Sequence, residues 1–418
     1  MAKNLALGFQ MNRSKPKVLI VSWNYPWPET LGGSIRTLNF ARFFKQYGNV
    51  DIVYSQGSTG NSTENGLFSS RYHFEKKAYP EDFLGRCRLA MKGVPYPIRE
   101  YGKDALRRLL GLIEENDYRF IFVRYCQSTS GLFNLPAKFK SRTIVDIDDV
   151  LSGSVYASFF NQKEGVHRKL LRTLNKKLLT RYETRCLKFG AALFCSDLDR
   201  KRLDRTRQRN RFVVPNIYEN KMFEAYDFGD GQKCPNTLLF IGTLHYAPNV
   251  EGLRWFIQTI FRRFKTGVPD ARLIVVGHAP ADEVKTLCER EDGVELHGDA
   301  VDIRRYYERC RAVVVPLLAG GGTRIKILEA ALAKRPVLST PMGAEGLEMK
   351  DGRELLFFKT PEDFCFKYKE LYNHKTYEAM VTRAQRVVQE KYSRKKFEES
   401  MQQVIAYLEG DFLRVSAA

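Results

Sequence analysis

The sequence has no apolar run of eighteen residues, which is the length that indicates a transmembrane helix. Residues 1–17 also lack the apolar core of a secretory signal and form a polar lead-in to the first predicted strand. These absences predict a protein that neither spans a membrane nor is exported by such a signal.

Metal-binding and disulfide patterns are missing as well. None of the eight cysteines forms a C-x-x-C pair, and the six histidines do not cluster near them. This spacing argues against a structural zinc site and against a disulfide framework. We expect no metal, and a reducing cytoplasm fits the cysteine usage best.

Acidic residues are few relative to basic ones. The 48 Asp and Glu residues face 68 Lys and Arg residues, so the formal net charge is +20. Nucleic acid, an anionic membrane surface and a polyanionic substrate are three partners that could explain this excess, and solubility alone is a fourth explanation. Composition alone does not distinguish these four explanations.

Short apolar runs alternate with helical patterns along the 418 residues, a length that favours two domains. This rhythm predicts an α/β fold with parallel sheets covered on both faces. A polar, turn-rich stretch at 216–235 separates two such series. The predicted strands are 17–22, 50–54, 120–124, 143–147, 191–195, 211–215, 237–242, 272–277, 294–297, 312–316, 336–339 and 354–358.

A glycine-rich turn follows the predicted strand at 312–316 and opens a helical pattern at 326–334. Its glycines permit positive φ angles and close backbone approach, and the free amides of a helix start favour a diphosphate. Arg324 and Lys326 add positive charge, and Glu329 can accept hydrogen bonds from ribose hydroxyls. The predicted ligand-binding residues here are Gly320, Gly321, Gly322, Thr323, Arg324, Lys326 and Glu329. A glycine-rich loop without a ligand remains the alternative.

The segment 320–346 resembles the donor-site signature of glycosyltransferase family 4, the glycosyl transferases group 1. Segments that resemble other parts of the same family are 31–36, 195–200, 214–216 and 240–250. The resemblance spans residues 17 to 410 and is looser from 55 to 140. It implies the GT-B fold, in which two Rossmann-like, doubly wound parallel-sheet domains face a cleft.

The resemblance also implies domain limits and further donor contacts. We expect an acceptor-side domain over 1–218, a donor domain over 219–390 and a terminal helical segment over 391–418 that packs back toward the first domain. It implies donor contacts at Gly32, Gly33 and Thr243.

Two departures from the family pattern concern the donor site. The first acid of the family's E-x7-E pattern is replaced by Gly321, so that only Glu329 remains. Thr243 and Pro248 stand where the family often has Arg and Lys after the first donor-domain strand. Phosphate charge should therefore fall mainly on the helix start, Arg324 and Lys326.

By resemblance, the activity is transfer of a hexose from a UDP- or GDP-sugar to a hydroxyl of a glycan or lipid-linked acceptor. Retention of anomeric configuration, no required cofactor and a role in cell-surface polysaccharide or glycolipid synthesis are implied with it. Two alternatives stay open: a non-catalytic nucleotide-sugar-binding subunit, and a sugar-nucleotide 2-epimerase of the same fold.

Catalytic candidates are Asp148 and His245. Asp146, Asp148 and Asp149 end a predicted strand, and at most two of them can reach a cleft because successive side chains alternate in direction. Acceptor binding or proton transfer is one interpretation, and helix capping is the other. His245 lies in the loop after the first donor-domain strand, where an incidental histidine is equally common.

Two segments combine basic and apolar residues. A helical pattern over 165–190 has seven Lys and Arg residues, from Arg168 to Arg185, around an apolar stripe, and 86–99 forms a second such patch. Packing on the sheet explains the stripe, whereas the excess of cations favours peripheral contact with an anionic membrane on the cytoplasmic face. Neither segment has a nucleic-acid-binding motif, so no nucleic-acid partner is expected.

Overall fold

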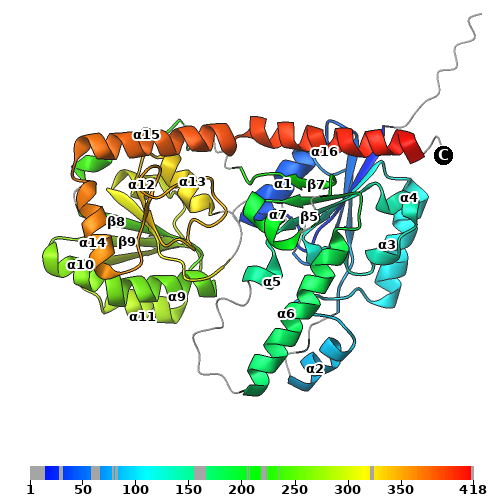
Figure 1. Cartoon of the computed structure of the whole chain (residues 1–418), viewed down its shortest axis with the longest axis horizontal. Helices are drawn as coiled ribbons and strands as arrows, with labels where there is room; N and C mark the ends of the chain where they lie inside the picture. Colours follow the sequence, from blue (N-terminus) through cyan, green and yellow to red (C-terminus); the bar gives the residue numbers. More distant parts are fainter. Residues whose placement is uncertain are drawn as a thin grey trace, which may run out of the picture. The chain divides into compact units, whose positions relative to one another are not determined.

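The computed structural model describes residues 15–27, 32–57, 66–77, 80, 83–154, 166–204, 206, 208–217, 223, 225–234, 236–320 and 324–415. The backbone forms two parallel α/β domains with sheets of seven and six strands (Figure 1). By internal contacts the chain divides into unit 1, residues 1–80, 97–146 and 188–191, and unit 2, residues 81–96, 147–187 and 192–418. The predicted domain limits at 218 and 390 stay predictions.

The first sheet has the strand order β3-β2-β1-β4-β5-β6-β7. Its strands are β1 Lys17–Val21, β2 Asn49–Tyr54, β3 Ser70–His73, β4 Phe120–Arg124, β5 Thr143–Asp148, β6 Ala191–Phe194 and β7 Arg211–Val213. The strand order reverses direction between β1 and β4, which is the switch point where doubly wound sheets bind ligands beyond the carboxyl ends of their strands.

The helices of this half connect those strands. They are α1 Gly32–Phe44, α2 Phe83–Met91, α3 Lys103–Asn116, η1 Cys126–Thr129, η2 Leu132–Asn134, α4 Ala137–Lys140, α5 Leu151–Ser154, α6 Val166–Cys186 and α7 Asp197–Leu203. Gly32 and Gly33, two of the predicted donor contacts, begin α1. A Cβ on Gly33 would meet the Tyr125 hydroxyl at 2.2 Å, so glycine is required there by packing.

The second sheet has the order β10-β9-β8-β11-β12-β13, with its switch point between β8 and β11. Its strands are β8 Thr237–Ile241, β9 Arg272–Gly277, β10 Val294–Gly298, β11 Ala312–Val315, β12 Val337–Ser339 and β13 Leu356–Phe357. Alternate residues of β8 face opposite sides of this sheet. Leu238 and Phe240 belong to one buried cluster, whereas Leu239 and Ile241 belong to the other.

Helices cover both faces of the second sheet, as Figure 1 shows. They are α9 Ala247–Trp255, the π-helical turn η5 Phe256–Phe261, α10 Arg262–Gly267, α11 Asp282–Glu289, α12 Arg304–Glu308, α13 Ile325–Leu332, α14 Pro361–Glu370 and α15 His374–Lys391. A further helix, α16 Arg394–Val415, follows α15. A short 3-10 turn, η4 Gly231–Lys233, precedes β8. On α16, the ring of Tyr407 lies 5.6 Å from that of Phe212 in β7. No helix in the described ranges is both long and apolar enough to cross a membrane.

A buried ion cluster joins α1 to two strands of the first sheet. Arg36 in α1 donates to both Asp146 oxygens, at 2.7 and 3.0 Å, and Arg124 donates to Asp146 at 2.9 Å. All three side chains are at most 2% exposed. The Arg124 guanidinium also lies 3.7 Å from the centroid of the Tyr125 ring. Asp146 is therefore engaged inside the fold, and its carboxylate neutralises two buried cations in part.

Replacing Asp146 by Asn should destabilise the protein by about 3–5 kcal/mol, because two buried guanidinium groups would lose the counter-charge that they share. Urea unfolding measures this loss. The matched control is Asp104→Asn, which breaks an exposed pair with Arg107 and should change stability by less than about 1 kcal/mol. Equal unfolding midpoints for the two variants would contradict the assignment.

Candidate functional site

The glycine-rich turn lies beyond the carboxyl end of β11, at the switch point of the second sheet. Gly320 has φ +118°, a conformation that favours glycine, and a Cβ placed there would lie 3.3 Å from Arg324 Nη2. The Arg324 side chain thus folds back over the turn and is largely buried. Gly321, Gly322 and Thr323 lie outside the described residues, so their predicted contacts stay predictions.

Lys326, in the first turn of α13, reaches across the switch point to the loop after β8. Its ammonium donates to Asn249 Oδ1 at 3.1 Å and lies 5.0 Å from the centroid of the Phe240 ring. A Cβ on Gly242 would come within 3.0 Å of the same ammonium. The Asn249 amide in turn donates to the carbonyl of Thr243 at 3.0 Å. A cation therefore sits beside the loop after β8, where the sequence itself offers Thr243 and Pro248 in place of basic residues.

The pKa of Lys326 is lowered to about 7. Burial is the main cause, the positive charge of Arg324 lowers the pKa further, and the Glu329 carboxylate opposes both. Glu329 is itself buried and accepts a hydrogen bond from the Tyr307 hydroxyl at 2.9 Å. Arg324, Lys326 and Glu329 thus form one interacting group at the start of α13, with an excess of positive charge suited to an anionic ligand.

Asp149 lies close enough to the donor loop for its charge to act on Arg324 and Tyr246. Burial lowers the pKa of Arg324, and Asp149 is the first of the nearby groups whose negative charge opposes this. Tyr246, in the loop after β8, has its pKa raised by burial and by Asp149 and lowered by Arg324. The sequence analysis did not single out Tyr246; its place directly after the candidate His245 was the signal available.

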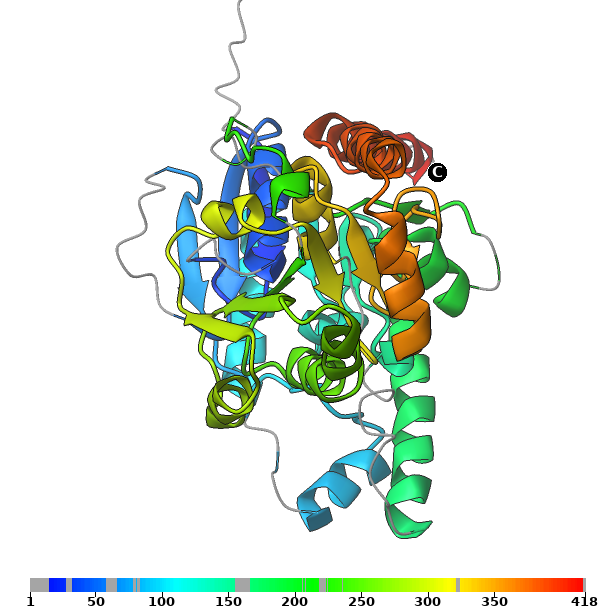
Figure 2. The same ribbon diagram turned by 90° about the vertical axis from the view of Figure 1, so that its left-hand side faces the viewer.

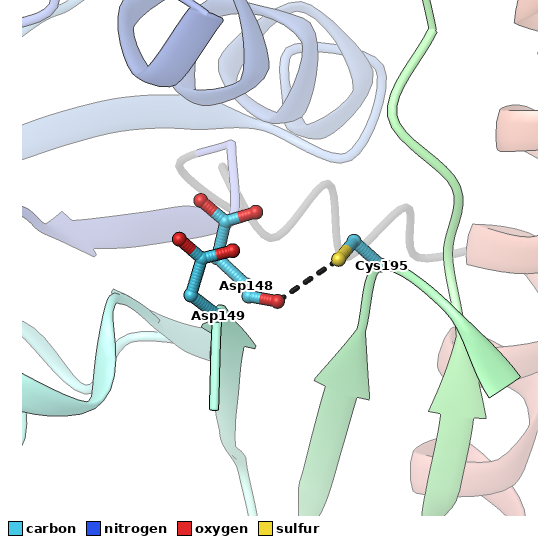
Figure 3. Close-up of side chains that lie close together, drawn as sticks. All are labelled: Asp148, Asp149 and Cys195. Carbon is cyan, nitrogen blue, oxygen red and sulfur yellow. Dashed lines mark hydrogen bonds between the residues drawn. The ribbon is translucent and has the colours of Figure 1, made fainter. Parts of the chain in front are cut away.

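Asp148 ends β5 and Asp149 follows it, both beside Cys195 (Figure 3). Asp148 adopts φ +52°, and its backbone carbonyl accepts a hydrogen bond from the Cys195 thiol at 2.9 Å. Side-chain ligand atoms of the three residues lie within 4.8 Å of one another. Two hard carboxylates and one soft thiol match neither the all-oxygen set of magnesium nor the nitrogen and sulfur sets of zinc. Arg324 already supplies positive charge here, so we assign no metal to this group.

His245 is exposed in the loop between β8 and α9. Its ring centroid lies 6.2 Å from that of His278, at the end of β9, and His278 Nδ1 lies 2.6 Å from Asp299 Oδ1. The structure thus brings His245 to a second histidine with a carboxylate partner, beyond the carboxyl ends of β8, β9 and β10. Gly32 and Gly33 belong to unit 1, and their predicted donor contacts stay predictions.

Comparison with known proteins locates the resemblance in the second half of the chain. Residues 235–374 match the family model described as glycosyl transferases group 1. The chain is also 23% identical over 357 residues to an uncharacterized 44.6 kDa protein in the cps region of Klebsiella pneumoniae, covering 81% of this chain and 87% of that protein.

Solved structures share the fold over nearly the whole chain. HepE from Anabaena, in complex with UDP and glucose, has a TM-score of 0.63 at 12% identity and covers 93% of this chain and 99% of its own. A mutant of S. aureus TarM, in complex with fondaparinux, alpha-GlcNAc-glycerol and UDP, has a TM-score of 0.63 at 11% identity with the same coverage.

The fold is that of the GT-B glycosyltransferases, as predicted: two parallel-sheet, Rossmann-like domains. The chain resembles the glycosyl transferases group 1, and its matched segment contains the Gly320 turn, Lys326 and Glu329. Together, the family match and the fold support sugar transfer as the activity.

Lys326 should make stability depend on pH. Its pKa is about 7 in the folded protein against an ordinary 10.5, so the folded state binds fewer protons than the unfolded state between these values. Stability should therefore rise with pH from about 7 to about 9.5. Unfolding midpoints of Lys326→Met should rise less over this range than those of the wild type. Lys375→Met, at an exposed position, is the control. If the unfolding midpoint of Lys326→Met rises with pH as steeply as that of the control, the assignment is refuted.

Proposed function

We propose that the chain is a hexosyltransferase that uses a UDP- or GDP-sugar and acts on a hydroxyl of a glycan or lipid-linked acceptor. The observation that carries this proposal is the cationic group at the second switch point. Arg324 and Lys326 meet beside Gly320, with Glu329 one turn further along α13. A diphosphate fits this charge, and Glu329 is suited to ribose hydroxyls. The UDP in the HepE and TarM complexes supports a uridine nucleotide.

The proposed chemistry is breakage of the bond between the anomeric carbon and the diphosphate while the acceptor oxygen attacks. Negative charge develops on the departing diphosphate, and fixed cations stabilise it most in a site that excludes water. Arg324 and Lys326 would serve this purpose. Lys326 would take up a proton when the donor binds, because a nearby diphosphate raises the pKa of its ammonium above about 7.

Retention would follow if the acceptor attacks from the same face as the leaving group. The departing phosphate oxygen could then take the acceptor proton. No separate cofactor is needed for this step. Asp149, near Arg324 and Tyr246, and Asp148 beside it are the carboxylates suited to position the acceptor hydroxyl. His245, with His278, is the candidate for contact with the donor phosphate or acceptor.

The relative encoded in a cps region supports a cytoplasmic role in cell-surface polysaccharide or glycolipid synthesis. A non-catalytic nucleotide-sugar-binding subunit and a 2-epimerase remain the alternatives, since Gly321 replaces an acid of the family pattern. Product analysis separates them. A subunit leaves the donor intact, an epimerase converts it with no acceptor present, and a transferase hydrolyses or transfers it.

A thermal-shift screen of UDP-, GDP-, ADP- and CMP-sugars tests the donor site. We expect stabilisation by UDP- or GDP-sugars. Arg324→Ala and Lys326→Ala should each weaken that donor by about 1.5–3 kcal/mol, or roughly 10- to 150-fold in Kd, because each removes a charged hydrogen-bond donor to phosphate. Lys375→Ala, on α15, should leave the Kd unchanged. Stabilisation by none of the four nucleotide sugars would refute the proposal.

We also propose peripheral contact with an anionic membrane through a basic–apolar surface on α2 and α6. These helices pack together (Figure 2). Asn175 on α6 accepts a hydrogen bond from the backbone amide of Tyr96 and donates one to the Tyr96 carbonyl. Apolar side chains on this surface are exposed: Leu84, Met91, Tyr96, Leu170 and Leu174. Exposed basic residues accompany them: Arg88, Lys92, Lys176, Lys177 and Arg181. This pairing suits insertion at an anionic lipid surface.

Co-sedimentation with phosphatidylglycerol–phosphatidylcholine vesicles tests this surface. The double variant Lys176→Gln/Lys177→Gln should lose about 2 kcal/mol of binding free energy, at about 1 kcal/mol per basic residue, or roughly 30-fold. Lys285→Gln/Lys375→Gln removes two exposed charges from the second sheet's helices and should bind like the wild type. Equal loss in the two double variants, or no binding by the wild type, would contradict the proposal.

A further inference from the structure

The switch point of the first sheet carries an aromatic platform that the proposed donor chemistry does not use. Trp23 lies directly after β1, and its carbonyl accepts hydrogen bonds from the amides of Ser55 and Gln56, both at 3.0 Å. Its indole nitrogen donates to Gln56 Oε1 at 2.9 Å. Trp23 is half-buried and lies beyond the carboxyl ends of β1 and β2, so this residue is partly open to solvent.

Lys76 brings a cation to this platform from the segment after β3. Its ammonium lies 4.4 Å from the centroid of the Tyr101 ring and 5.3 Å from that of Trp23. It donates to the carbonyl of Gln127 at 2.8 Å, and Gln127 lies in η1 directly after β4. Residues that follow β1, β3 and β4 thus converge at one edge of the sheet, on both sides of its switch point.

Arg99 adds a second positive charge. Its guanidinium carbon lies 5.0 Å from the centroid of the Trp23 ring. In the part of the chain that the structure describes, neither Lys76 nor Arg99 forms an ion pair with a carboxylate. Burial lowers the pKa of Lys76 to about 7, and Cys126 opposes this. The desolvated ammonium therefore lacks the counter-charge that buried cations usually have.

A buried hydroxyl group next to Gln127 also lacks a hydrogen bond. The side-chain oxygen of Ser128 is buried with no hydrogen-bond partner among the described residues, whereas the hydroxyl of Tyr101 pairs with that of Ser55. Tyr101 contacts Lys76 through its ring, Ser55 adjoins the Gln56 amide that binds Trp23, and Ser128 follows Gln127. An unsatisfied buried hydroxyl is uncommon in a folded protein, and a ligand is one explanation for that of Ser128.

We propose that Trp23, Lys76 and Arg99 form an acceptor subsite for an anionic group carried by a sugar, a carboxylate or a phosphate. This rests on the proposed transferase function, because it names the chemical class of the acceptor. Lys76 and Arg99 pair with the anion by charge-assisted hydrogen bonds, and the Trp23 ring contacts the apolar face of the attached sugar. The anion supplies the counter-charge that the described residues do not.

Binding of three sugars to the full-length protein tests this subsite by saturation-transfer NMR titration. D-Glucuronate carries a carboxylate, glucose 6-phosphate carries a phosphate, and D-glucose is the uncharged control. We expect at least one anionic sugar to bind about tenfold or more tightly than glucose, and the comparison of the two identifies the preferred anion. Anionic sugars that bind no better than glucose would overturn the proposal.

Variants then assign the effect to the named residues. Lys76→Met and Arg99→Gln should each weaken the preferred anionic sugar about tenfold while leaving glucose unchanged, and Lys76→Arg should restore most of the loss. Lys77→Met is the matched control, since Lys77 is the exposed neighbour, and it should bind like the wild type. If Lys76→Met lowers thermal stability without a selective loss of the anionic sugar, the cluster is structural and the proposal is wrong.

A donor thermal shift on the same preparations separates this proposal from the proposed function. If the protein is stabilised by a UDP- or GDP-sugar but shows no preference for anionic sugars, only the acceptor subsite is refuted. If no nucleotide sugar stabilises the protein, the transferase function is refuted whatever the anionic sugars do.

Discussion

One hydrogen bond, from the Lys326 ammonium to Asn249, joins the two sides of the switch point in the second sheet. Lys326 comes from the helix after β11, and Asn249 comes from the helix that follows β8. The bond holds a cation beside Gly242, where the absence of a Cβ leaves room for it. Because the Asn249 amide also fixes the Thr243 carbonyl, the loop that contains the candidate His245 is tied to the glycine-rich turn.

The same arrangement recurs in the first sheet with different residues. Lys326 and Lys76 each lie at a switch point, each contacts an aromatic ring and each has its pKa lowered by burial to about 7. Keeping such a cation out of water costs stability unless an anion compensates it. A donor diphosphate at Lys326 and an anionic acceptor group at Lys76 would offset that cost on binding. By contrast, Asp146 already compensates its two arginines inside the fold.

Apolar runs sufficed to predict both sheets, because buried parallel strands such as β11 are apolar throughout. β3 was missed, since Ser70–His73 is only partly buried and mostly polar. The terminal helical segment expected over 391–418 contains α16 Arg394–Val415, whereas α15 His374–Lys391 was not predicted. Among site residues, motif and resemblance gave Arg324, Lys326 and Glu329 as one segment. The cluster of Trp23, Lys76 and Arg99 could not be predicted, because it joins loops brought together only by strand order.

Hydrogen exchange with and without a stabilising UDP- or GDP-sugar tests the central claim most directly, because the free amides of the glycine-rich turn and the start of α13 are the groups proposed to hold the diphosphate. The account predicts slower exchange in peptides that cover residues 316–332 and in those that cover 242–249, with no change in α14 or α16. Protection confined to other segments, with unchanged exchange at 316–332, would contradict the donor-site assignment.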